Sequence, residues 1–112
     1  MVTYSDTARQ DLEDILYGLV TWEKHPLSFD HAKRYVSEIR AEADTVDQKR
    51  SHTPTVNMAH RLYGNYVHTY HRNRQTRWHV IYHWSASSCV AMVTKILNNF
   101  TTTALSPVKR HL

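Results

Sequence analysis

Two histidines, His79 and His83, lie four residues apart in the stretch 77–84. Imidazole changes its charge near neutral pH, so it can take up or release a proton in a reaction. The stretch alternates with period two: the histidines share one side with Ile81, and the other side carries Trp78, Val80, Tyr82 and Trp84. Branched and aromatic residues favour an extended strand. The sequence therefore predicts a strand whose apolar set faces the core and is more buried on average than its two histidines.

Cleavage of RNA through its 2′-hydroxyl is the chemistry that these side chains would suit. It requires a base, an acid and cations that stabilise a pentacovalent phosphorane. His79 and His83 are the candidates for proton transfer. Five basic residues near the predicted strands are candidates for binding RNA or another anion: Arg61, Arg72, Arg74, Arg77 and Lys95. The alternative is that both histidines are solvated strand residues and that the arginines keep a sheet edge and a turn soluble.

No metal or cofactor site is expected. His79 and His83 would stand about 13 Å apart at a strand rise of roughly 3.3 Å per residue, which is too far to chelate one ion. The sequence has a single cysteine, Cys89, and no HExxH motif. One cysteine cannot form an internal disulfide, which suits a reducing compartment.

Composition indicates one soluble globular domain. A chain of 112 residues can bury a two-layer core, and its hydrophobic (41%) and charged (21%) fractions are ordinary. No apolar run approaches the roughly 20 residues of a membrane span. The N-terminus lacks the pattern of a secretory signal, so we expect a cytoplasmic protein that does not engage a membrane. A net charge of +4 and nine histidines favour an anionic partner without identifying it.

The first half of the chain predicts a short strand and a helical hairpin. Residues 2–4 are extended, and Ser5 can cap a helix whose apolar stripe is Ala8, Leu12, Ile15, Leu16, Leu19 and Val20. Pro26 ends this helix, because the residue before a proline avoids the helical region. Ser28 can cap a second helix with apolar positions at Phe29, Ala32, Val36, Ile39, Ala43 and Val46. The short link makes the two helices antiparallel partners.

The second half predicts an antiparallel meander. Residues 48–59 are polar, contain Pro54 and show neither the helical nor the strand period, so we interpret them as a loop. Residues 61–64 then form a turn that leads the chain into the sheet. The expected strands are 66–71, 77–84 and 90–97, and polar turns at 73–76 and 85–88 connect them. The predicted fold class is α+β: a short N-terminal strand, an antiparallel helical hairpin and a three-stranded antiparallel meander. The domain should span residues 1–100, with 101–112 a polar C-terminal tail.

This order of elements resembles the RelE/ParE superfamily of toxins from bacterial toxin–antitoxin systems. Ser5-x-x-Ala8-x-x-Asp11-Leu12-x-x-Ile15 is similar to the family's opening S-x-x-A-x-x-D-L-x-x-I, and Ala32-x-x-Tyr35-Val36-x-x-Ile39 is similar to its second helix. Residues 78–82 stand where the family usually has Y-R-[IV]-x-Y, and Val93-Thr94-Lys95-Ile96 resembles its last strand. The resemblance covers residues 2–100.

The resemblance implies the toxin component of a type II toxin–antitoxin module. A cognate antitoxin would neutralise it by folding a disordered, acidic and amphipathic tail across the helices and the sheet edge. Such toxins act on translation, by cleaving mRNA at the ribosome, or on DNA gyrase. Here His79 replaces the usual strand arginine, and Asn98-Asn99-Phe100 stands where the ribonuclease members carry His or Tyr; both departures favour the gyrase-directed type. The alternative is a non-catalytic module of this fold that only holds a protein partner or nucleic acid.

Overall fold

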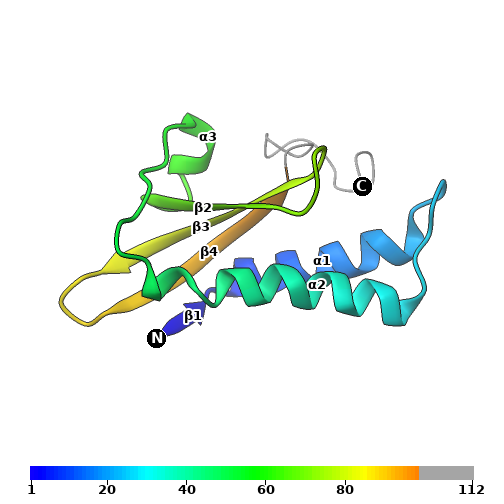
Figure 1. Ribbon diagram of the computed structural model, residues 1–112, viewed down its shortest axis with the longest axis horizontal. Helices are drawn as coiled ribbons and strands as arrows, with labels where there is room; N and C mark the ends of the chain where they lie inside the picture. Colours follow the sequence, from blue (N-terminus) through cyan, green and yellow to red (C-terminus); the bar gives the residue numbers. More distant parts are fainter. Residues whose placement is uncertain (99–112) are drawn as a thin grey trace.

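A computed structural model describes residues 1–98 of the chain (Figure 1). Its elements in chain order are β1 (Val2–Tyr4), α1 (Asp6–Thr21), α2 (Phe29–Ala43), the 3-10 turn η1 (Val46–Gln48), α3 (Met58–Arg61), β2 (Tyr66–His71), β3 (Arg77–Ser85) and β4 (Val90–Asn98). The fold is α+β, as predicted. In this part of the chain no helix is long and apolar enough to cross a membrane. The predicted tail, 101–112, lies outside the described residues.

The four strands form one mixed sheet in the order β1-β4-β3-β2. β2, β3 and β4 are an antiparallel meander, and β1 pairs in parallel with the first residues of β4. The hairpin of α1 and α2 lies along one face of the sheet, and α3 lies on the other side of it, near β2 (Figure 1). The molecule therefore has a two-layer body and a small helical cap.

Both long helices begin at a serine cap. The Ser5 hydroxyl accepts a hydrogen bond from the backbone N–H of Ala8 at 3.1 Å, and the Ser28 hydroxyl accepts one from His31 at 3.2 Å. The backbone N–H of Leu27 donates to the carbonyl of Leu19 at 3.0 Å, which closes the hairpin. The apolar stripes of both helices then pack on the sheet. The buried core consists of Ala8, Leu12, Ile15, Leu19, Ala32, Ile39, Ala43, Val46, Trp78, Val80, Tyr82, Ala91, Val93 and Ile96.

The faces of β3 are those that its alternation predicts. On the side of the helices, Trp78, Val80 and Tyr82 are at most 1% exposed and Trp84 is half-buried. On the opposite side, His79 is half-buried and His83 is exposed. The prediction that the apolar set is more buried than the histidines is confirmed.

The segment between α2 and β2 has more structure than the predicted loop. Its middle lies along β2, because the N–H of Val67 donates to Thr53 and the N–H of Thr55 donates to Asn65, each at 2.9 Å. α3 follows, capped by the Asn57 side chain, which accepts from the N–H of Ala59 at 2.9 Å. Four helical residues are too few to produce a hydrophobic period, which is why the sequence pattern missed this element.

The close approach of this segment to β3 requires a glycine. A β-carbon at Gly64 would lie 2.8 Å from the carbonyl oxygen of Tyr82 and 3.0 Å from the side chain of Ile81. Ile81 shares the face of the histidines but is fully buried. The segment that contains α3 therefore covers part of the sheet face that was predicted to be open.

Candidate functional site

The sheet face opposite the helical hairpin, here called the open face, gathers polar side chains from all three strands of the meander. Side chains alternate between faces along a strand, so the register assigns to this face Thr69, His71, Arg77, His79, His83 and Lys95. Thr69 lies opposite His79, and His71 lies opposite Arg77. The structure thus places both candidate histidines and two of the five candidate cations on one surface.

His79 has the most perturbed environment of this face. Its Nδ1 lies 3.1 Å from the Thr69 hydroxyl, and its ring centre lies 5.4 Å from that of His60 on α3. Burial lowers the pKa of His79 to about 4, and the positive charges of His60, Arg77 and His71 act in the same direction. At neutral pH this imidazole is therefore uncharged, so it can accept a proton but cannot serve as a general acid.

His60 is a residue that the sequence analysis missed. It is 6% exposed, and its Nε2 has no hydrogen-bond partner among the described residues. Burial lowers its pKa as well. Its ring packs near that of His79 on the sheet, which places α3 beside His79. Because it belongs to a segment with neither helical nor strand period, no pattern in the sequence linked it to His79.

His83 and His79 are not in contact. Both side chains point to the open face, but four residues of strand keep them about 13 Å apart. His83 lies opposite Met92, which is 42% exposed, near the other end of β3. A base and an acid on the same phosphate must lie within hydrogen-bond reach of it. The two predicted candidates are thus not gathered into one proton-transfer site.

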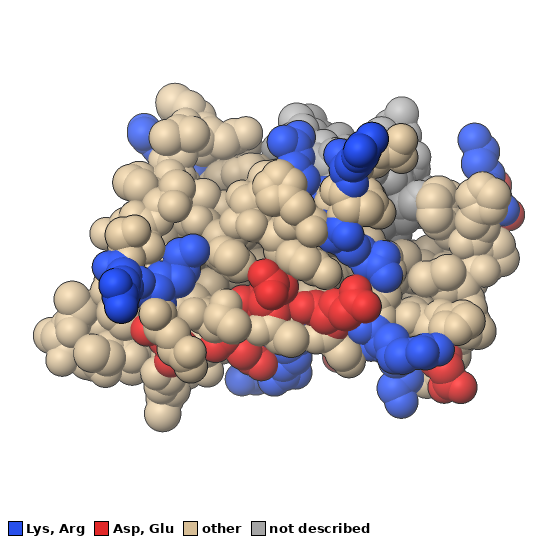
Figure 2. All heavy atoms as spheres, in the orientation of Figure 1, with Lys and Arg blue, Asp and Glu red and all other residues tan. Residues whose placement is uncertain are grey.

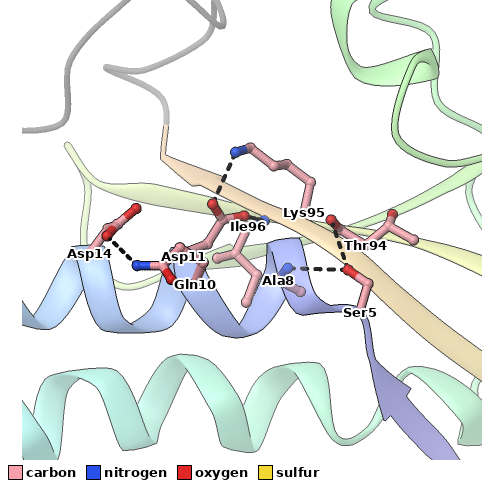
Figure 3. Close-up of polar contacts among 8 residues, drawn as sticks. All are labelled: Ser5, Ala8, Gln10, Asp11, Asp14, Thr94, Lys95 and Ile96. Atoms are coloured by element: carbon pink, nitrogen blue, oxygen red, sulfur yellow. Dashed lines mark hydrogen bonds and ion pairs between the residues drawn. The ribbon is translucent and has the colours of Figure 1, made fainter.

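Lys95 joins two elements. Its ammonium donates to one carboxylate oxygen of Asp11 at 2.9 Å, and the backbone N–H of Ile96 donates to the other at 2.9 Å (Figure 3). Burial raises the pKa of the Asp11 carboxyl, and the hydrogen bonds from Ile96 and Lys95 oppose that rise. The ammonium also lies 5.3 Å from the centre of the Tyr63 ring. Lys95 thus fastens α1 to β4 in addition to its place on the open face.

The remaining candidate cations lie elsewhere. Arg72 is on the helical side, where its Nε donates to Glu38 at 3.1 Å and its guanidinium stacks on Tyr35 at 3.7 Å. Arg61 donates from Nε to the carbonyl of Thr55 at 2.9 Å, within the segment that carries α3. Arg74 is exposed in the turn between β2 and β3. It therefore lies in the turn at the end of the sheet, and Arg61 and Arg72 do not belong to the open face.

No protein-family model, curated protein or solved structure that we compared matches this chain. The resemblance to the RelE/ParE superfamily therefore rests on the order of the elements and on the short motifs.

Two of those motifs, more than eighty residues apart in the chain, contact each other (Figure 3). The Ser5 hydroxyl, which caps α1, donates to the carbonyl of Thr94 at 3.3 Å. Asp11 holds Lys95 and Ile96, as described above, and the apolar members of the opening motif lie in the core. The matching residues thus build the junction of α1 and β4.

Charge is divided sharply between the two halves of the chain, a signal that the sequence analysis did not use. All ten aspartates and glutamates fall within residues 6–47, and none follows Asp47. Nine of the fourteen lysines and arginines and seven of the nine histidines do follow it. On the visible face in Figure 2 the acidic side chains gather along α2. Among the described residues, those after Asp47, which form the sheet and the α3 segment, therefore contain lysines, arginines and histidines but no aspartate or glutamate, whereas the first 47 residues contain all ten aspartates and glutamates.

The lowered pKa of His79 predicts a pH dependence of stability. The folded-state pKa of about 4 lies below the roughly 6.5 of an unfolded histidine, so the neutral imidazole stabilises the fold above about pH 6.5. This contribution is lost as the pH falls from there toward 4. The thermal midpoint of His79→Gln should therefore fall less than that of the unchanged chain between about pH 7 and pH 5. Exposed His83 provides the control: His83→Gln should follow the unchanged chain, and parallel curves for all three proteins would contradict the assignment.

Proposed function

We propose that this chain is the toxin component of a type II toxin–antitoxin module and that it inhibits growth by acting on translation, with the open face as its RNA-binding surface. One observation carries the proposal: the open face presents His71, Arg77, His79 and His83, and among the described residues the strand register places no aspartate or glutamate on it. The order of the elements and the contact between the two motifs agree with a RelE/ParE-like toxin.

The charge division suits a ligand with a regular row of negative charges. Binding of lysines and arginines to phosphates releases counterions, which supplies much of the affinity for nucleic acid. Residues 1–47 hold all ten aspartates and glutamates but only five of the fourteen lysines and arginines, so the helical layer attracts a long phosphate strand less than the open face does. A long RNA strand is therefore expected to lie mainly on the side of the sheet away from α1 and α2.

Cleavage by this surface would use His79 as the base. Neutral His79 would take the proton of a 2′-hydroxyl, whose oxygen attacks the adjacent phosphorus while the bond to the 5′-oxygen breaks and that oxygen gains a proton from water. Arg77 and Lys95 would face the charge that develops on the phosphorane. The separation of His79 from His83 and the burial of His60 favour the second candidate function, a module that holds RNA or its partner protein without cleaving.

The cognate antitoxin is the expected protein partner, and an exposed apolar patch offers it a surface. Val56, Met58 and Leu62, here called the loop patch, are 81%, 76% and 83% exposed. Their loop is held at its base, because the Thr55 hydroxyl donates to the carbonyl of Gly64 at 2.8 Å. A rigid apolar patch loses little entropy on binding, and the surrounding chain has no carboxylate. Both features suit an acidic, amphipathic segment.

Controlled expression in bacteria tests the proposal. Induction should arrest growth and reduce protein synthesis first, and co-expression of a small gene adjacent to this one should restore growth. Mapping of transcript ends then separates the two candidate functions: new ends indicate cleavage, and intact transcripts indicate binding alone. Normal growth with abundant folded protein would overturn the toxin proposal. Arrest with a DNA-damage response and altered supercoiling would instead assign the activity to gyrase.

A further inference from the structure

A groove of about 690 Å³ lies on the helical side of the molecule, away from the open face. It separates the tip of the α1–α2 hairpin from the turn between β2 and β3. Its walls include Trp22, Leu27, His31, Arg34, Tyr35 and Arg72. The volume is in the range of small-molecule sites, and the combination of apolar walls with a few polar groups is typical of them. Neither the toxin proposal nor the open face assigns it a role.

One wall of the groove is a fixed planar stack. The Arg72 guanidinium lies 3.7 Å from the centre of the Tyr35 ring, and its Nε donates to Glu38 at 3.1 Å. The Tyr35 hydroxyl accepts a hydrogen bond from Nε1 of buried Trp78 at 3.1 Å, which holds the ring in place. Trp22, half-buried just after α1, supplies another aromatic surface. Aromatic rings and arginine planes are the surfaces on which nucleobases stack.

The polar side of the groove is cationic. His31 and Arg34 lie three residues apart near the start of α2, so they share a face of that helix. The side chain of Arg34 forms no hydrogen bond or ion pair with another residue of the described part of the chain. The one carboxylate in the lining, that of Glu38, is already bound by Arg72. An anionic group is therefore the natural complement of Arg34 and His31.

We propose that this groove binds a nucleotide, with its base against Trp22 and the Arg72–Tyr35 stack and its phosphate between Arg34 and His31. The ligand is a phosphorylated nucleoside, present either as a free mononucleotide or as one residue of a single-stranded RNA. The proposal does not rest on the toxin function, because the groove and the open face lie on opposite sides of the sheet.

Titration of the full chain, followed by tryptophan fluorescence and calorimetry, tests the site. The probes are the four ribonucleoside 5′-monophosphates, adenosine, inorganic phosphate and a short 5′-phosphorylated RNA. Nucleotides should bind and quench Trp22, and adenosine or phosphate alone should bind far more weakly. Arg34→Gln should weaken nucleotide binding about tenfold, because it removes a charge-assisted contact. Lys33→Gln, which alters the neighbouring exposed cation outside this groove, should have no effect.

Trp22→Phe locates the signal. It should remove the fluorescence change while calorimetry still detects binding. If RNA binds more tightly than the mononucleotides and depends on Arg34, the natural ligand is a strand; if it binds no better, the ligand is a free nucleotide. The proposal is overturned if no nucleotide binds more tightly than about 1 mM, if Arg34→Gln binds normally, or if acrylamide fails to reach Trp22 in the ligand-free chain, since the groove is then closed.

Discussion

A chain that carries Arg74→Gln and Arg77→Gln should no longer arrest growth. Arg77 lies on the open face opposite His71, and Arg74 is exposed in the turn at its end. Loss of two phosphate contacts should weaken single-stranded RNA binding about a hundredfold, at about tenfold for each charge-assisted contact. The salt dependence should change too: the slope of log K against log salt becomes shallower by about 0.7 for each contact that is removed.

The matched control removes the same number of charges from the helical layer. Arg9→Gln with Lys33→Gln lowers the net charge equally, and both side chains are exposed there. This chain should bind RNA with nearly unchanged affinity and slope and should still arrest growth. Filter binding at several salt concentrations measures both quantities. Equal losses in the two double variants would show that net charge alone attracts RNA and that the open face has no special role.

The loop patch carries the second large effect. Replacement of Val56, Met58 and Leu62 by serine should release the toxin from its antitoxin, so that growth arrest persists when the adjacent gene is co-expressed. Burial of one large apolar side chain contributes about 1.5–3 kcal/mol. Full burial of three such side chains, even at the lower figure, implies about a thousandfold loss of affinity. The stability of the free chain should change little, because all three side chains are already exposed.

Two exposed apolar residues of the helical hairpin provide the comparison. Tyr17 and Phe29 are 70% and 58% exposed, so Tyr17→Ser with Phe29→Ser tests whether the antitoxin lies across the helices instead. Calorimetry with the purified adjacent gene product should show weakened binding only for the loop-patch variant. If the helical variant alone loses affinity, the antitoxin covers the hairpin and the loop patch has another role.

Local signals predicted most of the fold. The serine caps, the proline after α1 and the two periodicities each act within a few residues, so Ser5, Ser28 and the alternation of β3 could be interpreted directly. The role of Asp11 could not, because it depends on Lys95 and Ile96, more than eighty residues away in the chain. The contact of His60 with His79 could not be predicted for the same reason, since only folding brings the two residues together.

The candidate cations show how far a sequence can place a site. All five were chosen for their proximity to predicted strands, yet a strand sends successive side chains to opposite faces. His71 lies opposite Arg77, so Arg72 must point the other way, toward Glu38. The opposite directions of His71 and Arg72 follow from the alternation of side chains along the chain, so the placement of Arg72 could have been predicted. The division of charge at Asp47 was likewise present in the sequence, and it indicates the cationic sheet more clearly than any single histidine does.

Backbone amide NMR with a short single-stranded RNA tests the central claim, that the open face is the working surface. Addition of RNA to the isotope-labelled full chain should shift the signals of Thr69, His71, Arg77 and His79 along one saturable curve. The same titration of the Arg74→Gln and Arg77→Gln chain should leave these signals in place. If saturating RNA shifts no open-face signal in the unchanged chain, or shifts these signals equally in the double variant, the open face is not the RNA-binding surface.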